Sequence, residues 1–301
     1  MTDSRYDFPD KIVRVTAGKG SAESYLIFAA EKTVLMECGM AYCHRGLTDN
    51  IHKALKEKGR SGLDYIALSH SHYDHVGALP YVLDEWPDAK VIAAEKARKV
   101  FQSEGAKKTI TRLLLEAARN YGAEHEPYDA DKLKVDIVVG DNDVIDLGAG
   151  EKLKVLETKG HTDCSLTYVL EPDRIMFSSE STGVIRAEGV ITSAILKSYK
   201  QAVESAKKCM AYKPDKLITP HYGMMTESEK LSFFIWFLIA AEREKDYILD
   251  SFDRSGSVEG AVDLYEKRYW SEDWLEGQPK AAFIENANAT VRNVLKEFGR
   301  I

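Results

Sequence analysis

The chain has 301 residues, of which 44% are hydrophobic and 30% are charged. This is the composition of an ordinary globular protein, long enough for one large domain or two modest ones. The net charge of −7 argues against nucleic acid or an anionic membrane as a partner, because both require a basic surface.

Targeting signals and cysteine spacing favour a cytoplasmic protein. The residues after Met1 are polar and contain no apolar signal core. The most apolar run, 231–240, is about half of the roughly 20 residues that a membrane span requires, so we predict a buried helix there. Cys38, Cys43, Cys164 and Cys209 form no CxxC pair, which is typical of a reducing compartment.

The first part of the chain predicts a sheet followed by helices. Short apolar runs at 11–17, 23–29 and 32–38 predict an antiparallel meander. Apolar residues at helical spacing predict a helix over 45–59. Strands follow at 63–68 and 89–94. A stretch rich in Ala, Lys, Glu and Leu over 95–121 then predicts a helical insertion, with outer bounds of about 95–125.

The second part of the chain repeats this pattern of strands followed by a helix. Predicted strands lie at 134–139, 143–147, 152–158, 165–170, 174–178 and 216–219, with a helix at 198–211. The repetition predicts an α/β fold in which two sheets pack face to face between outer helices. From about residue 226 the pattern is helical, with breaks near 255–256 and 278–279. We therefore predict a catalytic domain at 1–225 and a helical cap or dimerisation region at 226–301.

One short run carries most of the recognisable chemistry. His70, His72, Asp74 and His75 follow the predicted strand at 63–68, although the whole chain contains only 8 histidines. Their side chains leave the C-terminal end of a strand, where open α/β sheets bind ligands. This spacing predicts a metal site.

Three further residues stand at the ends of other predicted strands. His161 follows the strand at 152–158, Glu180 follows the strand at 174–178, and His221 follows the strand at 216–219. Neutral imidazoles together with carboxylates suit zinc, iron or manganese. The remaining histidines have no such setting and are predicted on the surface: His44, His52 and His125.

These motifs together resemble the metallo-β-lactamase superfamily. The resemblance rests on HxHxDH at 70–75, Gly-His-Thr at 160–162, an acid after Phe-Ser-Ser at 177–179, and Pro-His-Tyr-Gly at 220–223. It covers residues from about 12 to about 225, in the family's order. It implies an αββα sandwich with the active site at one edge, extended here by C-terminal helices.

The resemblance also implies two divalent metal ions and a role for each motif residue. His70, His72 and His161 match the ligands of one ion, while Asp74, His75 and His221 match those of the other, and Glu180 matches the bridging acid. Zinc is expected first, with iron or manganese as alternatives. Two such ions lower the pKa of a shared water, and the resulting hydroxide, oriented by Asp74, attacks the substrate.

Two positions depart from the family pattern. The bridging acid is usually aspartate, whereas this chain has Glu180. The longer side chain leaves three arrangements open: Glu180 bridges both ions, binds one, or reaches neither. Glu37 likewise stands where the family often has an aspartate that supports the site from behind its ligands.

The substrate must be inferred from the surroundings of the site. The chain looks most similar to the thioesterase-like members of the quinolone-signal-response type, which have a helical C-terminal cap. We therefore expect a hydrolase of a small ester or thioester. A phosphodiesterase with the same metals and a non-catalytic regulator that retains the metal fold are the alternatives.

Two aromatic residues are candidates for substrate contact, namely Tyr73 and Phe234. For Phe234 and its aromatic neighbours, the alternative is that they pack the helix onto the domain or onto a second subunit. The apolar helix at 231–240 makes a homodimer a reasonable expectation.

Overall fold

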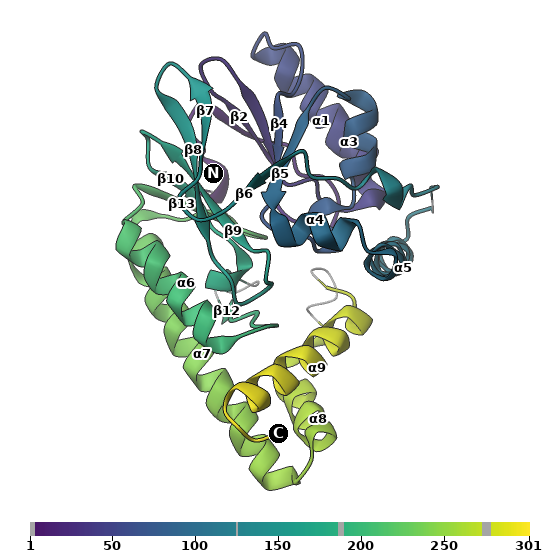
Figure 1. The fold of residues 1–301 in the computed structure, drawn as a ribbon, viewed down its shortest axis with the longest axis vertical. Coiled ribbons are helices and arrows are strands. Elements are labelled where there is room, and N and C mark those ends of the chain that lie inside the picture. Colours follow the sequence, from purple (N-terminus) through teal and green to yellow (C-terminus); the bar gives the residue numbers. More distant parts are fainter. Residues whose placement is uncertain (1–3, 125, 186–189, 273–277) are drawn as a thin grey trace.

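The computed structural model describes residues 4–124, 126–185, 190–272 and 278–301. In this part of the chain, two mixed sheets pack face to face and helices cover their outer faces (Figure 1). A group of helices extends from one end of the sandwich. The predicted αββα architecture with a helical C-terminal region is therefore confirmed.

The first sheet contains six strands in chain order: β1 (Ile12–Arg14), β2 (Tyr25–Phe28), β3 (Thr33–Met36), β4 (Tyr65–Ala67), β5 (Lys90–Ala94) and β6 (Ile137–Val139). The pairs β1–β2 and β2–β3 are antiparallel, as the predicted meander requires. The later pairs, from β3 to β6, are parallel. The strand predicted at 134–139 therefore belongs to the first sheet. We had expected it in the second sheet, because it begins the second strand-rich part of the sequence.

The second sheet contains β7 (Val144–Gly148), β8 (Glu151–Glu157), β9 (Leu166–Glu171), β10 (Ile175–Phe177), β13 (Lys216–Thr219) and β14 (Gly223–Met224). Both β8 and β10 run antiparallel to β9, and β13 runs parallel to β10. The C-terminal ends of β8, β10 and β13 consequently meet at one edge of the sheet. A separate hairpin pairs β11 (Val184–Ile185) with β12 (Ile191–Thr192).

The helices of the sandwich are α1 (His44–Glu57), α2 (Tyr73–Val76), α3 (Leu79–Glu85), α4 (Glu95–Phe101), α5 (Glu104–Asn120) and α6 (Tyr199–Tyr212). The predicted helical insertion is thus two helices, interrupted where the side chain of Ser103 accepts a hydrogen bond from the Ala106 backbone and caps α5. The last residue of that predicted insertion, residue 125, lies outside the described residues. Short 3-10 helices occur at η1 (Ser4–Tyr6), η2 (Ala41–Cys43), η3 (Ala130–Lys132) and η4 (Glu180–Thr182).

Two hydrogen bonds join the sheets at the edge where the motif lies. The buried Tyr168 hydroxyl of β9 donates to the Leu68 carbonyl at 2.9 Å. The Leu166 backbone N–H, also in β9, donates to the Ser69 carbonyl at 2.8 Å. Apolar side chains fill the space between the sheets, and Leu26, Ile66 and Val155 are among those that are fully buried. The loop after β4 is therefore fixed to both sheets.

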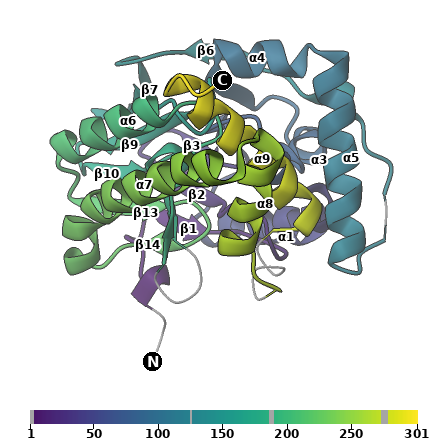
Figure 2. The same ribbon diagram turned by 90° about the horizontal axis from the view of Figure 1, so that it is seen from below.

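The C-terminal region consists of α7 (Glu227–Ser255), α8 (Val258–Tyr269) and α9 (Lys280–Glu297). Thr226 and Glu229 form a capping box at the start of α7. The first half of α7 packs beside α6 on the second sheet, whereas its second half extends beyond the sandwich and packs against α8 and α9 (Figures 1 and 2). Within the described residues, no helix combines the length and the apolar character that crossing a bilayer requires.

The aromatic residues near the start of α7 belong mainly to the core. Phe233, Phe234 and Phe237 are buried against the outward face of the second sheet and α6. Trp236 and Ile235 face outward and are 44% and 50% exposed. The packing role that we considered for this helix is therefore the observed role of the three phenylalanines.

This packing predicts a large stability difference between neighbouring positions of α7. We expect Phe237→Ala to lower the free energy of unfolding by about 3–5 kcal/mol, because it removes a buried ring and leaves a cavity. Arg243→Ala, at an exposed position of the same helix, should cost less than about 0.5 kcal/mol. Urea denaturation of both variants measures the difference, and equal losses would contradict the packing described here.

Candidate metal centre

The motif lies on the loop that leaves β4 and enters α2. His70 and His72 lie on the loop, while Asp74 and His75 lie in the first turn of α2. Backbone hydrogen bonds hold both ends of the motif against the end of β3. Glu37 N–H donates to the Ala67 carbonyl at 3.1 Å, and Cys38 N–H donates to the His75 carbonyl at 2.8 Å.

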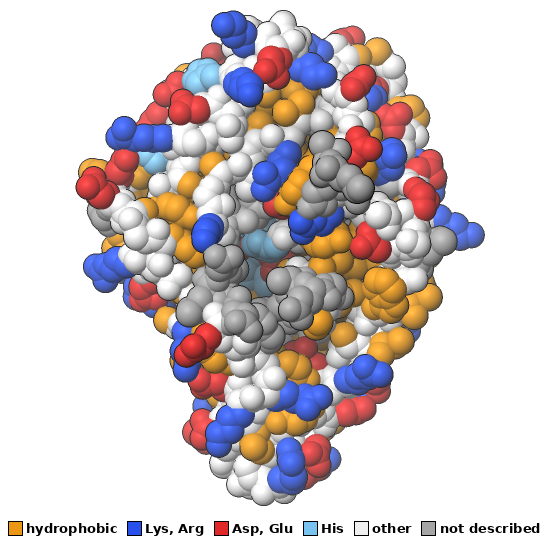
Figure 3. All heavy atoms as spheres, turned by 180° about the vertical axis from the view of Figure 1, so that it is seen from behind, with side chains coloured by type: hydrophobic (Ala, Val, Ile, Leu, Met, Phe, Trp, Pro, Cys, Tyr) orange, Lys and Arg blue, Asp and Glu red, His pale blue; other side chains and the backbone are white. Residues whose placement is uncertain are grey.

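The other three predicted residues arrive from the second sheet. His161 follows β8, Glu180 begins η4 just after β10, and His221 lies in the turn between β13 and β14. Four strand ends thus bring together all seven side chains that the sequence singled out. Figure 3 shows histidine side chains at the bottom of a hollow near the middle of one face.

A glycine allows the approach of the His161 loop. Gly160 has φ of +133°, and a Cβ atom there would lie 2.5 Å from the backbone of Ala202 in α6. Only glycine fits this position without displacing the helix. The Gly-His pair in the sequence therefore has a direct steric reason.

The first candidate group consists of His70, His72 and His161. His161 Nε2 lies 3.0 Å from His72 Nδ1. Two nitrogens bound to one tetrahedral ion at zinc distances would lie about 3.3 Å apart, so this spacing suits a shared ion. His70 Nε2 is buried and has no hydrogen-bond partner, while its Nδ1 lies 2.9 Å from the Ser69 hydroxyl. An unpartnered buried nitrogen that faces two other imidazoles fits a metal ligand.

The second candidate group consists of Asp74, His75, Glu180 and His221. Glu180 Oε1 lies 2.7 Å from His75 Nε2 and 3.1 Å from His221 Nε2. Asp74 Oδ2 lies 3.4 Å from His221 Nε2 and 3.8 Å from His75 Nε2. Two imidazoles and two carboxylates therefore converge, and this donor set suits a divalent ion.

Glu180 lies between the two groups. Its Oε1 contacts His75 and His221 of the second group, whereas its Oε2 lies 3.2 Å from His161 Nε2 of the first group. The side chain is thus long enough to reach both groups with different oxygens. Of the three arrangements open from the sequence, this geometry favours bridging.

Glu37 supports the second group from behind. One carboxylate oxygen accepts a hydrogen bond from Ser69 N–H at 2.8 Å, and the other lies 3.3 Å from His75 Nδ1. A carboxylate at Nδ1 leaves Nε2 of the same ring directed at the metal position. Glu37 adopts a left-handed φ of 60°, which is uncommon for a residue with a side chain and directs this carboxylate inward.

The two groups differ in the electrostatics of their histidines. Burial, reinforced by neighbouring imidazoles, lowers the pKa of His70 and His72 well below the usual value. These rings are therefore neutral and ready to bind a cation. Burial also opposes protonation of His75, but Glu37, Asp74 and Glu180 outweigh it and raise the pKa of His75 well above the usual value.

Contacts between acids and imidazoles also set the pKa values of the other members of the second group. For His221, Glu180 and Asp74 overcome the effect of burial and raise the pKa. Burial acts against ionised Glu180, yet His161, His221 and His75 hold its pKa well below the usual range. Burial raises the pKa of Asp74, and His75 and His221 only partly offset this. Without a metal, these shifts favour imidazolium–carboxylate pairing in the second group.

Sequence reasoning missed the groups that orient the first candidate group. His161 Nδ1 donates to the Ala194 carbonyl at 2.7 Å, and His161 N–H donates to the Ser181 hydroxyl at 3.0 Å. A backbone carbonyl carries no residue signature, so only the fold could place Ala194 here. The serine-rich stretch around Glu180 offered a weak signal for Ser181.

A cavity of about 790 Å³ opens onto both candidate groups. Its walls come from α5, the β11–β12 hairpin, the loop after that hairpin, and helices α8 and α9. Tyr73 lines it, and the contact of Tyr73 with a substrate stays a prediction. Phe234 does not line it, because this ring is buried between α7 and the second sheet. Lys197 supplies the cationic side chain among the described lining residues.

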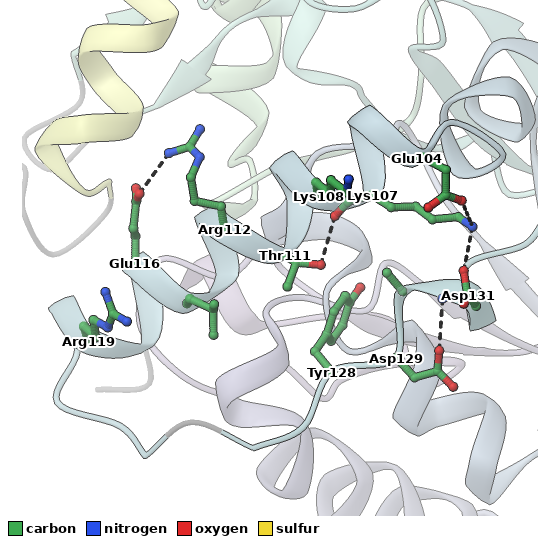
Figure 4. Close-up of a pocket in the computed structure, with 12 residues that line it drawn as sticks. Glu104, Lys107, Lys108, Thr111, Arg112, Glu116, Arg119, Tyr128, Asp129 and Asp131 are labelled. Carbon is green, nitrogen blue, oxygen red and sulfur yellow. Dashed lines mark hydrogen bonds and ion pairs between the residues drawn. The ribbon is translucent and has the colours of Figure 1, made fainter.

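A second hollow lies on the opposite side of α5 and carries none of the predicted site residues. Figure 4 shows it between α5 and the segment around η3. Its charged groups are largely paired with one another. Lys107 bonds Glu104 at 3.0 Å and Asp131 at 2.7 Å, and Arg112 bonds Glu116 at 2.8 Å.

The two described histidines outside the motifs, His44 and His52, lie away from the site. His52 is exposed, as predicted. The prediction was wrong for His44, which is only 13% exposed because its ring stacks on Tyr81 at 3.8 Å and pairs with Glu126. His125 lies outside the described residues.

Comparison with known proteins agrees with the geometry. Residues 17–221 match the family model described as the metallo-beta-lactamase superfamily. A metallo-beta-lactamase fold-containing protein of Sulfurisphaera tokodaii is 31% identical over 169 residues, which are 54% of this chain and 62% of that protein. The hydroxyacylglutathione hydrolase of Prochlorococcus marinus is 27% identical over 133 residues, which are 44% of this chain and 40% of the hydrolase.

A solved structure extends the similarity over almost the whole chain. The metallo-beta-lactamase family protein of Thermus thermophilus superposes with a TM-score of 0.65 and 17% identity. The superposition covers 97% of this chain and 95% of that one. This likeness concerns the fold, C-terminal helices included. In sequence, by contrast, the chain spans less than two thirds of the archaeal relative and of the hydrolase.

The imidazolium–carboxylate pairs predict that metal binding releases protons. His75 and His221 have raised pKa values, so each must lose a proton before its nitrogen can bind a cation. Metal affinity should therefore rise as the pH rises and fall steadily as the pH is lowered. Calorimetric titration of zinc at one pH, in buffers with different ionisation enthalpies, measures the release. A binding enthalpy that is independent of the buffer would contradict this description.

Proposed function

This chain belongs to the metallo-beta-lactamase superfamily, and we propose that it is a two-metal hydrolase that cleaves a small ester or thioester. The observation that carries the proposal is the arrangement of two donor groups with Glu180 between them, opening onto one cavity. Such an arrangement suits hydrolysis, because the two donor groups would hold cations beside a carboxylate and the substrate space.

We assign the metal ligands as the sequence predicted. His70, His72 and His161 would hold one ion, Asp74, His75 and His221 would hold the other, and Glu180 would contact both. The bound ions supply Lewis acidity and lower the pKa of a water towards neutrality. Zinc is the first expectation, and iron or manganese suit the same ligands.

The protein's own groups orient the reaction. Asp74 lines the cavity, and its Oδ2 lies beside His221. Its place in the second group and on the cavity wall supports our assignment of Asp74 as the residue that would orient the attacking water. Tyr73, the residue before Asp74, lines the same cavity, which supports a role for it in contacting the substrate.

Relatives and the shape of the cavity support an acyl substrate. The hydroxyacylglutathione hydrolase is named for cleaving an acyl derivative of a thiol. The cavity has a volume within the range of small-molecule sites and is partly enclosed by the C-terminal helices. We propose the cytoplasm as its location, on the four unpaired cysteines. We also propose a homodimer through the exposed Ile235, Trp236 and Ile239 of α7.

The proposal predicts metal-dependent ester hydrolysis that requires the motif. We expect protein loaded with zinc, iron or manganese to hydrolyse simple acyl thioesters or p-nitrophenyl acetate. His72→Ala and Asp74→Ala should each lower kcat/KM by more than about a hundredfold, a larger loss than removal of a group that only supports a ligand. His52→Ala, at an exposed histidine away from the site, is the matched control.

The same measurement separates the alternatives. A parallel panel of phosphodiesters tests the second hydrolase class. Turnover of phosphodiesters alone would replace the ester proposal. No turnover on either panel, with metal bound, would favour the non-catalytic regulator.

A further inference from the structure

We propose that the substrate carries a hydrophobic acyl chain, and that this chain occupies the part of the cavity between α5 and α9. The inference rests on the proposed function and narrows its substrate class. It follows from the side chains that line the cavity beyond the metal centre, where the walls become largely apolar.

The two walls come from segments far apart in the sequence. On one side, Val100 of α4 and Ile110 and Leu113 of α5 line the cavity. On the other side, Tyr265 of α8 and Phe283 of α9 line it. The two rings stack on each other, with centroids 6.2 Å apart. Figures 1 and 2 both place α9 beside α5.

An ion pair joins the helices that form the two walls. Arg112 of α5 bonds Glu285 of α9 at 2.6 Å, and both side chains are about half exposed. Polar groups such as Thr109, Asn286 and Thr290 also contribute to the lining. Beyond the metal centre, the described lining thus consists largely of apolar side chains with a smaller number of polar groups among them. A chain that is apolar along its length and ends in a reactive carbonyl matches this distribution.

Water in contact with such walls is readily displaced by an apolar group. Burying one methylene is worth about 0.8 kcal/mol, or about a fourfold change in an equilibrium constant. If the acyl chain lies against these walls in the transition state, kcat/KM should increase by a similar factor for each added carbon.

The test is a chain-length series of p-nitrophenyl esters from acetate to hexanoate on metal-loaded protein. We expect kcat/KM to increase by about two hundredfold across the series, with most of the gain lost in Ala106→Trp. Ala106 lines the cavity from α5, so the larger ring would fill the acyl space. Lys108→Trp on the same helix, which faces the hollow of Figure 4 instead, is the matched control and should keep the full series.

A binding measurement separates this inference from the proposed function. Calorimetry should show that hexanoate binds the metal-loaded protein more tightly than acetate, and that Ala106→Trp removes the difference. Hydrolysis that is independent of chain length, with equal binding of both acids, would overturn the acyl inference and leave the hydrolase proposal intact. If binding depends on chain length but no ester is hydrolysed, the hydrolase proposal is overturned and the apolar binding site for an acyl chain stands.

A different set of contacts carries a second inference: the structure assigns Glu244 of α7 as a positioning residue for the first candidate group. Glu244 is only 5% exposed. Its Oε1 accepts a hydrogen bond from the Tyr265 hydroxyl of α8 at 2.9 Å. Its Oε2 accepts a hydrogen bond from the Ser193 hydroxyl, which follows β12 directly. One buried carboxylate thus joins two C-terminal helices to the hairpin.

The residue after Ser193 reaches the metal centre. Ala194 has a left-handed φ of 48°, and its carbonyl accepts the hydrogen bond from His161 Nδ1. The same loop is fixed to the His161 strand end by Lys197 N–H, which donates to the Gly160 carbonyl at 2.9 Å. Since a non-glycine residue holds this conformation only under constraint, the anchor at Ser193 maintains the carbonyl in place. Glu244 therefore acts on His161 through the loop and without touching it.

The test is metal affinity, which does not depend on turnover. Glu244→Leu should weaken binding of the ion at the first candidate group about tenfold to a hundredfold in competition with a chelator, and should change the absorption spectrum of the cobalt-substituted protein. Glu242→Gln, at an exposed position of the same helix, should change neither. If Glu244→Leu does not fold, Ser193→Ala removes the same anchor and should weaken binding in the same direction. Unchanged affinity and spectrum in a folded anchor variant would overturn the assignment.

Discussion

The position of one carboxylate organises the site. Glu180 directs one oxygen at the imidazoles of His75 and His221 and the other at His161, so a single side chain contacts both candidate groups. Buried imidazoles without a counter-charge would be costly when protonated, and buried carboxylates without partners would be costly when ionised. The convergence of four strand ends reduces both energetic costs, because it surrounds the Glu180 carboxylate with imidazoles at hydrogen-bonding distance.

The rigidity of the frame explains how these strand ends stay in register. The loop after β4 is held by β3 on one side and by the backbone and tyrosine of β9 on the other. Each ligand loop therefore starts from a strand that is already paired, and few backbone angles remain free to move a ligand. This agrees with the general observation that precise sites are placed on loops that a rigid scaffold positions.

Much of this could be predicted from the sequence, because the informative signals were local. A histidine after an apolar strand is visible as a pattern, and the order of the motifs predicted that His70, His161, Glu180 and His221 would meet. The sheet to which β6 belongs was not visible, because a turn at 140–142 marks the end of a strand without identifying its neighbour. The Ala194 carbonyl was also hidden, since any residue supplies one. Phe234 was ambiguous for a related reason: an aromatic residue on an amphipathic helix has the same pattern whether it lines a cavity or fills a core.

The C-terminal helices contribute directly to the surroundings of the metal centre and do not merely cover it. They supply one wall of the cavity through Phe283, and they hold the loop behind His161 through Glu244. These helices therefore affect the metal centre although they are distant from its ligands in the sequence. Both roles depend on the length of α7, which begins on the second sheet and ends beyond the sandwich.

The charge pairing in the second group has a consequence for the order of assembly. In the metal-free chain, the raised pKa values of His75 and His221 favour their protonated forms, which offset part of the negative charge of Glu37, Asp74 and Glu180. Part of the buried negative charge is therefore balanced within the protein itself, whereas some small domains fold only when they bind zinc. This balance favours folding before metal binding, so the supply of ions around the folded protein contributes to the choice of metal.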